Sequence, residues 1–198
     1  MQVFFLRKDQ TVRLNFFFMR NLLANTFITL GIVLIIIAGL LLWQRYNPQR
    51  LAFSDVGNEI SESINEEKNL PVALKIEDLD IKLPVFPARS QTGKWETTTK
   101  GVSYLVSSAM PGQVGNSIFY GHNYKNILGN LKNAKPGQII EVKLANGVWR
   151  KFRIEYVQTV APNQTGILDQ TDDKRLTLYT CTGFLDSKRL VVTALFTP

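Results

Sequence analysis

The chain has 198 residues, of which 45% are hydrophobic, which is enough for one globular domain but hardly for two separate cores. It has 23 Lys and Arg against 16 Asp and Glu, a formal net charge of +7, which suits an anionic partner such as lipid headgroups or a wall polymer and equally a solvated face. No block of like charges and no basic stretch interleaved with aromatics occurs, so composition argues against a nucleic-acid partner.

The sequence contains a single cysteine and a single histidine. An intramolecular disulfide is therefore impossible, and the fold must depend on its core. A tetrahedral zinc site would need further ligands at CxxC or HxxxH spacing, and neither spacing occurs. We expect no metal and no cofactor, and any special role of Cys181 is that of a free thiol.

The first element is an apolar segment, residues 21–44, without an ionisable side chain. At ~1.5 Å rise per residue it is long enough to cross a hydrocarbon core of ~30 Å. A secretory signal is the alternative, but a small-residue cleavage site should then follow. Trp43 and Tyr46 stand there instead, where interfacial aromatics anchor a membrane span. The pattern favours a retained membrane anchor.

Charges around this segment indicate its orientation. Arg7, Lys8, Arg13 and Arg20 precede it, whereas the following residues soon become acidic. The positive-inside bias predicts a cytoplasmic segment 1–20, an anchor 21–44, an extracellular linker 45–70 and an extracellular globular domain 71–198.

The globular domain carries short runs of β-branched and aromatic residues between turn signals, which predicts an all-β fold. The clearest unit is a hairpin in which Ile139–Leu144 and Val148–Val157 flank Asn146-Gly147. Several short strands without long helices suggest a small closed barrel. The other predicted strands are Ala73–Ile76, Ser117–Tyr120, Thr177–Cys181 and Arg189–Phe196.

Three residues at predicted strand ends could carry chemistry. His122 follows the strand that ends at Tyr120, and Cys181 closes another. A short loop leads from Cys181 to Arg189, so a hairpin would bring this thiol and this guanidinium to the same end of adjacent strands. A cysteine nucleophile needs a group that exchanges its proton and a donor for the oxyanion, and these two partners could supply both.

Three motifs resemble those of the sortase family. Thr177-Leu178-Tyr179-Thr180-Cys181 resembles its TLxTC signature, and Arg189-Leu190-Val191-Val192 resembles the strand that carries its arginine. The segment from Pro111 to Asn123 resembles the PGxxGNxxxxGHN segment around its histidine. The resemblance covers roughly residues 72–198, with the three motifs in the family's order.

The resemblance implies an eight-stranded sortase-type β-barrel with short helices, preceded by the single transmembrane helix. It implies a cysteine transpeptidase of the Gram-positive plasma membrane that cleaves an LPxTG-like C-terminal sorting signal of secreted proteins between Thr and Gly. The acyl fragment would then pass to an amine of a peptidoglycan precursor or another protein. By similarity, Cys181 is the nucleophile, His122 the acid and base, and Arg189 the group that positions substrate or stabilises the oxyanion.

The resemblance also suggests substrate-binding residues. Thr180 would orient the bound peptide, and the family's specificity loop corresponds to residues 161–175, with Pro162, Asn163 and Gly166 as candidates. Residues 47–90 lack the Asp-Pro-aromatic motif of pilin-type members, which argues against a pilin polymerase. The acidic residues of the loop are interpreted as solvated charges rather than calcium ligands. These residues are Asp169, Asp172 and Asp173.

Two alternatives remain. An L,D-transpeptidase also uses an outward-facing cysteine and histidine, but keeps both within one short motif, whereas His122 and Cys181 lie far apart here. A catalytically inactive sortase-like module that binds the cell wall is the second. Such a module would be expected to lose one of the three residues, and this chain keeps all three.

Overall fold

The computed structural model describes residues 3–45, 51, 53, 69–91 and 94–198. It divides into two compact units, Met1–Asn47 and Pro48–Pro198. Most of the expected linker 45–70, including the interfacial Tyr46, lies outside the described residues.

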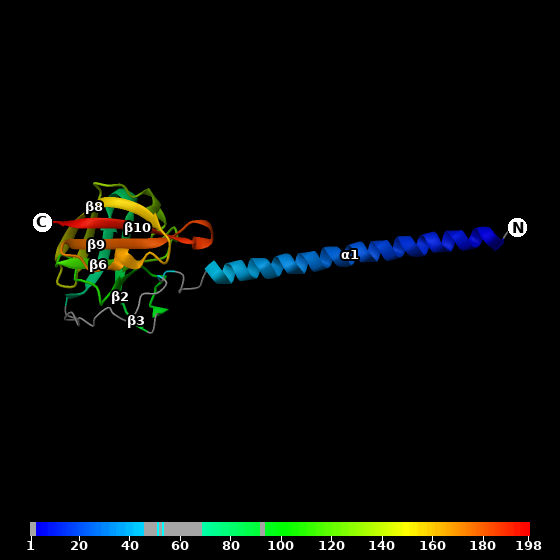
Figure 1. The fold of residues 1–198 in the computed structure, drawn as a ribbon, viewed down its shortest axis with the longest axis horizontal. Coiled ribbons are helices and arrows are strands. Elements are labelled where there is room, and N and C mark those ends of the chain that lie inside the picture. Colours follow the sequence, from blue (N-terminus) through cyan, green and yellow to red (C-terminus); the bar gives the residue numbers. More distant parts are fainter. Residues whose placement is uncertain (1–2, 46–50, 52, 54–68, 92–93) are drawn as a thin grey trace. The chain divides into compact units, whose positions relative to one another are not determined.

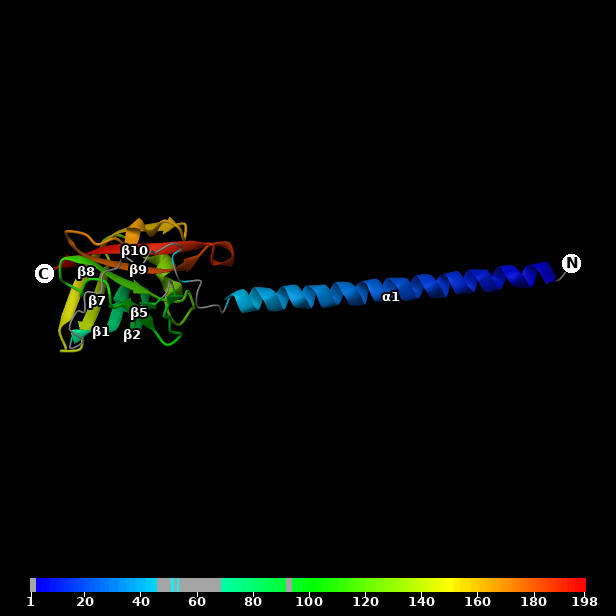
Figure 2. The same cartoon turned by 60° about the horizontal axis from the view of Figure 1, so that its bottom comes forward.

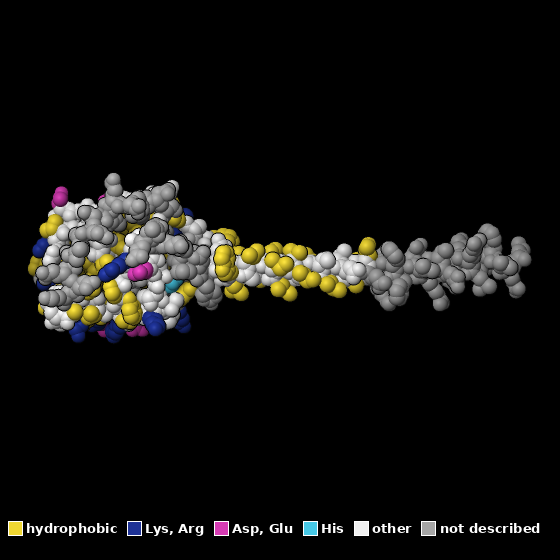
Figure 3. All heavy atoms as spheres, turned by 90° about the horizontal axis from the view of Figure 1, so that it is seen from below, with side chains coloured by type: hydrophobic (Ala, Val, Ile, Leu, Met, Phe, Trp, Pro, Cys, Tyr) yellow, Lys and Arg dark blue, Asp and Glu magenta, His cyan; other side chains and the backbone are white. Residues whose placement is uncertain are grey.

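The first unit is one long helix, α1, which spans Val3–Arg45. Its part from Leu22 to Gln44 is long and apolar enough to cross a membrane, and none of it is buried inside the structure. Figure 3 shows apolar side chains along this part of the helix. A helix that is apolar all round needs a surrounding apolar medium or partner, so this helix fits a membrane anchor or a signal segment.

The second unit is a closed barrel with the strand order β1-β2-β5-β6-β9-β10-β8-β7 (Figures 1 and 2). This confirms the predicted eight-stranded barrel. Two of its pairs, β2 with β5 and β6 with β9, are parallel and the rest antiparallel. The strands are β1 (Pro71–Ile76), β2 (Ile81–Ala88), β3 (Ser90–Gln91), β4 (Lys94–Trp95), β5 (Val102–Leu105), β6 (Gly115–Tyr120), β7 (Ile139–Leu144), β8 (Trp149–Val160), β9 (Lys174–Thr182) and β10 (Lys188–Thr197). Short 3-10 helices are η3 (Glu77–Leu79), η4 (Gly129–Asn133), η5 (Thr165–Leu168) and η6 (Phe184–Asp186).

The hairpin predicted at Asn146-Gly147 joins β7 to β8. Gly147 has φ +87, a conformation that favours glycine, and the Asn146 side chain accepts a hydrogen bond from the Val148 amide. Alternation along β7 buries Ile140, Val142 and Leu144, as the sequence pattern predicts.

Strands β2 and β5 were not predicted from the sequence. β2 contains Pro84 and Pro87, which disfavour a central strand. Its first half pairs with β1 and its second half with β5, so half of its backbone groups lie outside any ladder. A strand in this arrangement can hold proline.

Alternation produces two hydrophobic clusters on opposite faces of the barrel wall. The interior cluster takes buried side chains from all eight barrel strands, such as Phe119, Leu178 and Val192. The outer-face cluster takes the alternate residues of β6, β9 and β10 and adds side chains from loops and distant segments. It consists of Leu51, Phe53, Ala88, Trp95, Leu105, Ile118, Tyr120, Val160, Leu168, Tyr179, Cys181 and Val191.

Candidate active site

Cys181 and Arg189 lie side by side. In the antiparallel β9–β10 ladder they are direct partners, one step before its end at Thr182 and Lys188. Directly opposed residues project from the same face of a sheet, so the thiol and the guanidinium share one face. Both are buried, with exposed fractions of 5% and 4%.

His122 reaches the same edge through β6. That strand runs parallel to β9, with Tyr120 opposite Tyr179. The chain follows β9 one residue further, because the Gly121 amide donates to the Tyr179 carbonyl (3.2 Å). His122 lies two residues after Tyr120, and Cys181 lies two residues after Tyr179, so the two occupy corresponding positions on neighbouring parallel segments. The structure therefore brings His122, which is distant in the sequence, to the same edge as Cys181 and Arg189.

The imidazole of His122 stacks on one aromatic ring and is influenced by one carboxylate. Tyr124 stacks on it, with centroids 4.8 Å apart and planes inclined by 6°. Burial lowers the pKa of His122 below its ordinary 6.5, while the neighbouring Asp186 carboxylate opposes this by raising it. The ring is consequently mostly neutral at neutral pH and able to accept a proton.

Arg189 is held in place by main-chain carbonyls and an aromatic ring. Its Nη1 donates to the carbonyls of Asp186 and Lys188, both at 3.1 Å. Its guanidinium carbon lies 5.8 Å from the ring centroid of Phe53, within cation–π range. A buried positive charge fixed beside a cysteine favours the thiolate form.

The outer-face cluster surrounds this edge with aromatic side chains. Tyr120 and Tyr179 stack at 5.5 Å, Trp95 meets Tyr120 edge-on, and Phe53 meets Tyr179 edge-on at 5.0 Å. The Tyr179 hydroxyl is buried without a hydrogen-bond partner in the described part of the chain. Burial raises the pKa of Tyr179 far above its usual range. It is therefore a neutral group beside the thiol.

Thr180 points to the face opposite Cys181, since the two are consecutive in β9. Its hydroxyl is buried and donates to the Gly121 carbonyl at 2.7 Å. In this structure Thr180 thus ties β9 to the segment that leads into His122. Its predicted contact with a bound peptide stays a prediction.

The predicted specificity loop packs on the site through one of its apolar residues. Leu168 of η5 is buried in the outer-face cluster together with Cys181, and Ile167 packs against it. Of the predicted substrate residues, Pro162 is half-buried, whereas Asn163 and Gly166 are exposed. These exposed positions leave the two residues accessible to a ligand.

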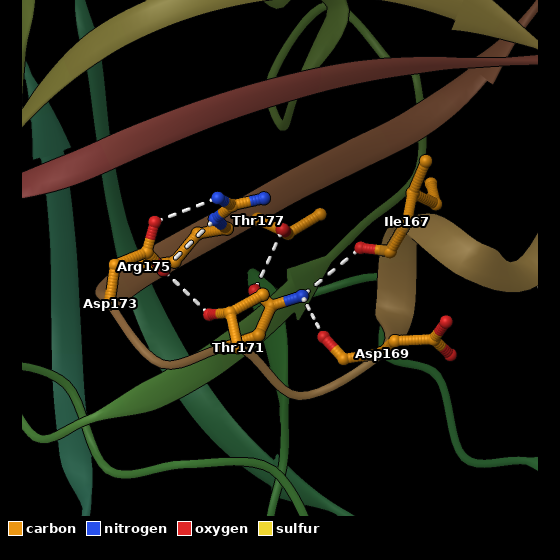
Figure 4. A network of polar contacts seen from close by, with 7 residues as sticks. Ile167, Asp169, Thr171, Asp173, Arg175 and Thr177 are labelled. Atoms are coloured by element: carbon orange, nitrogen blue, oxygen red, sulfur yellow. Dashed lines mark hydrogen bonds and ion pairs between the residues drawn. The ribbon is translucent and has the colours of Figure 1, made fainter.

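A buried asparagine, which the sequence analysis did not single out, fastens this loop to the barrel. Asn116 donates through Nδ2 to the carbonyls of Ile167 (3.0 Å) and Asp169 (3.2 Å) and accepts from Thr177 Oγ1 (2.8 Å) (Figure 4). The available signal was an amide side chain within an apolar strand, because such a residue must find hydrogen-bond partners when buried.

The acidic residues of the loop are dispersed along it. Within residues 3–45, 51, 53, 69–91 and 94–198, no three His, Cys, Asp or Glu side chains gather at a point. Asp173, interpreted from sequence as a solvated charge, instead accepts from Thr171 (2.6 Å) and pairs with Arg175 (2.7 Å). The Arg175 hydrogen bond lowers the pKa of Asp173. Asp169 and Asp172 are exposed.

A barrel wall that brings a thiol, an imidazole and a guanidinium to one edge is suited to thiol-based acyl transfer. Residues 74–197 match the family model of the sortase domain. The chain belongs to the sortase family, whose members are generally cysteine transpeptidases.

Solved structures agree with this assignment. A lid mutant of sortase A from Corynebacterium diphtheriae superposes with a TM-score of 0.56 and 26% identity, covering 65% of this chain and 70% of that one. Sortase C-1 from Actinomyces oris gives 0.55 and 26%, covering 64% and 71%. The complex of Streptococcus agalactiae sortase C1 with MTSET gives 0.57 at 19% identity, covering 67% and 69%, and supports the fold alone. No curated protein sequence matches the chain.

Proposed function

We propose that this sortase cleaves a C-terminal LPxTG-like sorting signal with Cys181 as nucleophile, His122 as acid and base, and Arg189 as substrate clamp and oxyanion donor. The observation that carries the proposal is the direct pairing of Arg189 with Cys181, at the edge where β6 delivers His122. Thr180, on the opposite face of β9 at this edge, has a structural hydrogen bond to the Gly121 carbonyl.

The first half-reaction forms a thioester. The Cys181 thiolate attacks the Thr carbonyl carbon of the Thr–Gly peptide bond. The resulting oxyanion accepts hydrogen bonds from Arg189. His122 takes up the proton that the Cys181 thiol gives up as it becomes the thiolate, and donates this proton to the leaving amine as the peptide bond breaks. The acyl fragment remains on sulfur, and the glycine-terminated fragment departs.

The second half-reaction transfers the acyl group. An amine of a peptidoglycan precursor or another protein attacks the thioester carbonyl, and neutral His122 accepts the proton that the amine loses. The thiolate of Cys181 leaves as the new amide forms. The lowered pKa of His122 supports this step because the ring must be neutral to accept the proton.

The proposal extends to location and to the specificity loop. The apolar helix anchors the chain in the plasma membrane with residues 1–20 in the cytoplasm, because Arg7, Lys8, Arg13 and Arg20 precede the span. The barrel then faces the outside, where sorting-signal proteins arrive. Pro162, Asn163 and Gly166 contact the signal from the loop 161–175, and Thr180 acts on it only indirectly, by fixing the segment that leads into His122.

The test uses the full chain in detergent micelles with a fluorescence-quenched sorting-signal peptide and triglycine as acceptor. We expect cleavage, a transpeptidation product, and a mass increase on Cys181 equal to the acyl fragment. Cys181→Ala is the matched control and should form none of these. An adduct that persists in Cys181→Ala would refute the mechanism, and cell-wall binding without adduct formation would favour the inactive wall-binding module.

A further inference from the structure

The loop between β9 and β10 reaches back to the histidine segment through one carboxylate. Asp186 Oδ1 accepts a hydrogen bond of 2.9 Å from Asn123 Nδ2, and Asn123 directly follows His122. The main-chain carbonyl of the same Asp186 accepts the 3.1 Å hydrogen bond from Arg189 Nη1. One residue therefore contacts both the histidine segment and the arginine.

We propose that Asp186 is a positioning residue that couples His122 to Arg189, through its carboxylate on the one side and its carbonyl on the other. The inference rests on the proposed roles of these two residues. The carboxylate fixes the segment that carries the imidazole and contributes a negative charge beside it. The carbonyl fixes the direction of the guanidinium beside Cys181.

Two residues of the β9–β10 loop have unusual backbone conformations that place both groups of Asp186. Leu185 has φ 50 and Asp186 has φ 57, both in the left-handed region, which is uncommon for residues other than glycine. Asp and Asn tolerate this region better than other side chains, whereas Leu does not. Strain of this kind persists where surrounding contacts enforce it, and here both groups of Asp186 are held by hydrogen bonds.

The charge of Asp186 acts on His122 in a defined direction. Burial lowers the pKa of His122 and the carboxylate raises it, so removing the carboxylate leaves burial less opposed. Other titratable or charged groups near this edge are Cys181 and Tyr179 on β9, Arg189 and Lys188 on β10, and Tyr120 and Tyr124. The carboxylate that acts on the pKa of His122 is that of Asp186.

The test is an NMR titration of the imidazole, which can be assigned without ambiguity because the chain has one histidine. The full chain in micelles is compared as wild type, Asp186→Asn and Asp172→Asn. Asparagine retains an acceptor for Asn123 and tolerates the left-handed backbone, so Asp186→Asn removes mainly the charge. Asp172 is exposed and precedes the opposite end of β9, which makes Asp172→Asn a matched control for loss of one negative charge.

We expect the His122 midpoint to move to lower pH in Asp186→Asn and to stay unchanged in Asp172→Asn. The limb of the pH–rate profile that His122 sets should move in the same direction. The maximal kcat should fall about tenfold, less than the ~10²–10⁴ expected for loss of His122 itself. KM should remain within about twofold, because a positioning residue acts through His122 and Arg189 and not on the peptide.

A second variant separates the hydrogen bond from the charge and covers the case in which Asp186→Asn fails to fold. Asn123→Ala keeps the carboxylate but releases it from the histidine segment, so the midpoint should fall by less than in Asp186→Asn. Equal midpoints in wild type and in every folded variant of Asp186 and Asn123 would overturn the proposal. The titration needs no substrate, so a His122 shift in a protein without peptide cleavage would contradict the proposed function and leave this coupling standing.

Discussion

The interior cluster and the outer-face cluster are built from the same strands, yet they serve different purposes. Leu178 in the interior and Tyr179 on the outer face are neighbours in β9, and both are fully buried. The interior cluster is formed mainly by the eight barrel strands, with additions such as Leu79 of η3 and Leu131 of η4. The outer face is closed by side chains from elsewhere, such as Phe53, Trp95 and Leu168. The outer-face cluster also contains the thiol and the buried Tyr179 hydroxyl, which has no hydrogen-bond partner among the residues that the structure describes.

This difference between the two clusters predicts which substitutions change the free energy of unfolding and which change the reaction rate. Interior positions are fixed by the alternation of each strand, and a change there is expected to act on the free energy of unfolding. Under the proposed function, outer-face positions surround a site that a peptide must reach, so part of their covering would be replaced or moved when substrate binds. Substitutions on the two faces should therefore separate stability from rate.

The largest expected effect is the loss of all acyl transfer in Cys181→Ala, because the chain has no other thiol. The substitution removes one small group from the outer-face cluster, so the melting temperature should change little. Peptide cleavage and thermal unfolding are measured on the same sample. Cleavage by Cys181→Ala above the background of an uncatalysed control would show that the active site is not at Cys181 on the outer face.

His122→Ala should cost nearly as much in rate, since groups that act as a unit lose most of their effect when one is removed. Intact mass spectrometry after mixing with peptide should show little or no thioester. A variant that forms the thioester at the wild-type rate but fails to resolve it would restrict His122 to the second half-reaction.

Arg189→Lys should lower the transpeptidation rate by ~10²–10³, the usual cost of losing one oxyanion donor. Lysine keeps the charge but cannot reproduce the planar fork that holds two carbonyls and a substrate at once. The rate and the melting temperature of the same variant are compared with those of Lys188→Arg, an exposed neighbour on β10. Near wild-type turnover would remove Arg189 from the site.

A matched pair of small truncations compares the faces directly. Ile140 lies in the interior cluster and Ile118 in the outer-face cluster, and both are almost completely buried. Each Ile→Val change should lower the free energy of unfolding by about 0.5–1.5 kcal/mol in urea titrations. Only Ile118→Val should also change the rate of acyl transfer. Equal kinetic effects would show that the two faces are not independent.

The sequence predicted the local parts of this arrangement. Alternation in Ile139–Leu144 and the turn at Asn146-Gly147 depend on neighbours in the chain, and both are confirmed. β2 was missed because its prolines oppose the strand pattern, and only its split pairing with β1 and β5 makes them acceptable.

The candidate site was predictable to the extent that it rests on strand ends. Cys181 and Arg189 are paired by one hairpin, so their proximity follows from the short loop between them. The contacts of Asn116, Asp186 and Phe53 depend on segments that are distant in the sequence. The alternation of apolar and polar residues along a strand does not predict such long-range contacts. Their residue types gave a hint only for Asn116, since a buried amide requires partners.

The smallest expected effect concerns Phe53, whose ring covers the site from a position outside the barrel strands. It lies edge-on to Tyr179 at 5.0 Å and within 5.8 Å of the Arg189 guanidinium, and only 4% of it is exposed. Aromatic contacts of this kind contribute ~0.5–1.5 kcal/mol beyond area burial, which corresponds to about two- to tenfold in an equilibrium between covered and open thiol. Phe53→Ala should therefore raise the rate at which iodoacetamide alkylates Cys181 by this factor, because the reagent reacts only with an accessible thiolate. Phe53→Leu, which keeps an apolar cover without the ring quadrupole, should give an intermediate rate, and Phe184→Ala is the control for loss of an exposed phenylalanine. Alkylation at the wild-type rate in Phe53→Ala would show that the outer-face cluster is closed by the barrel and its loops alone.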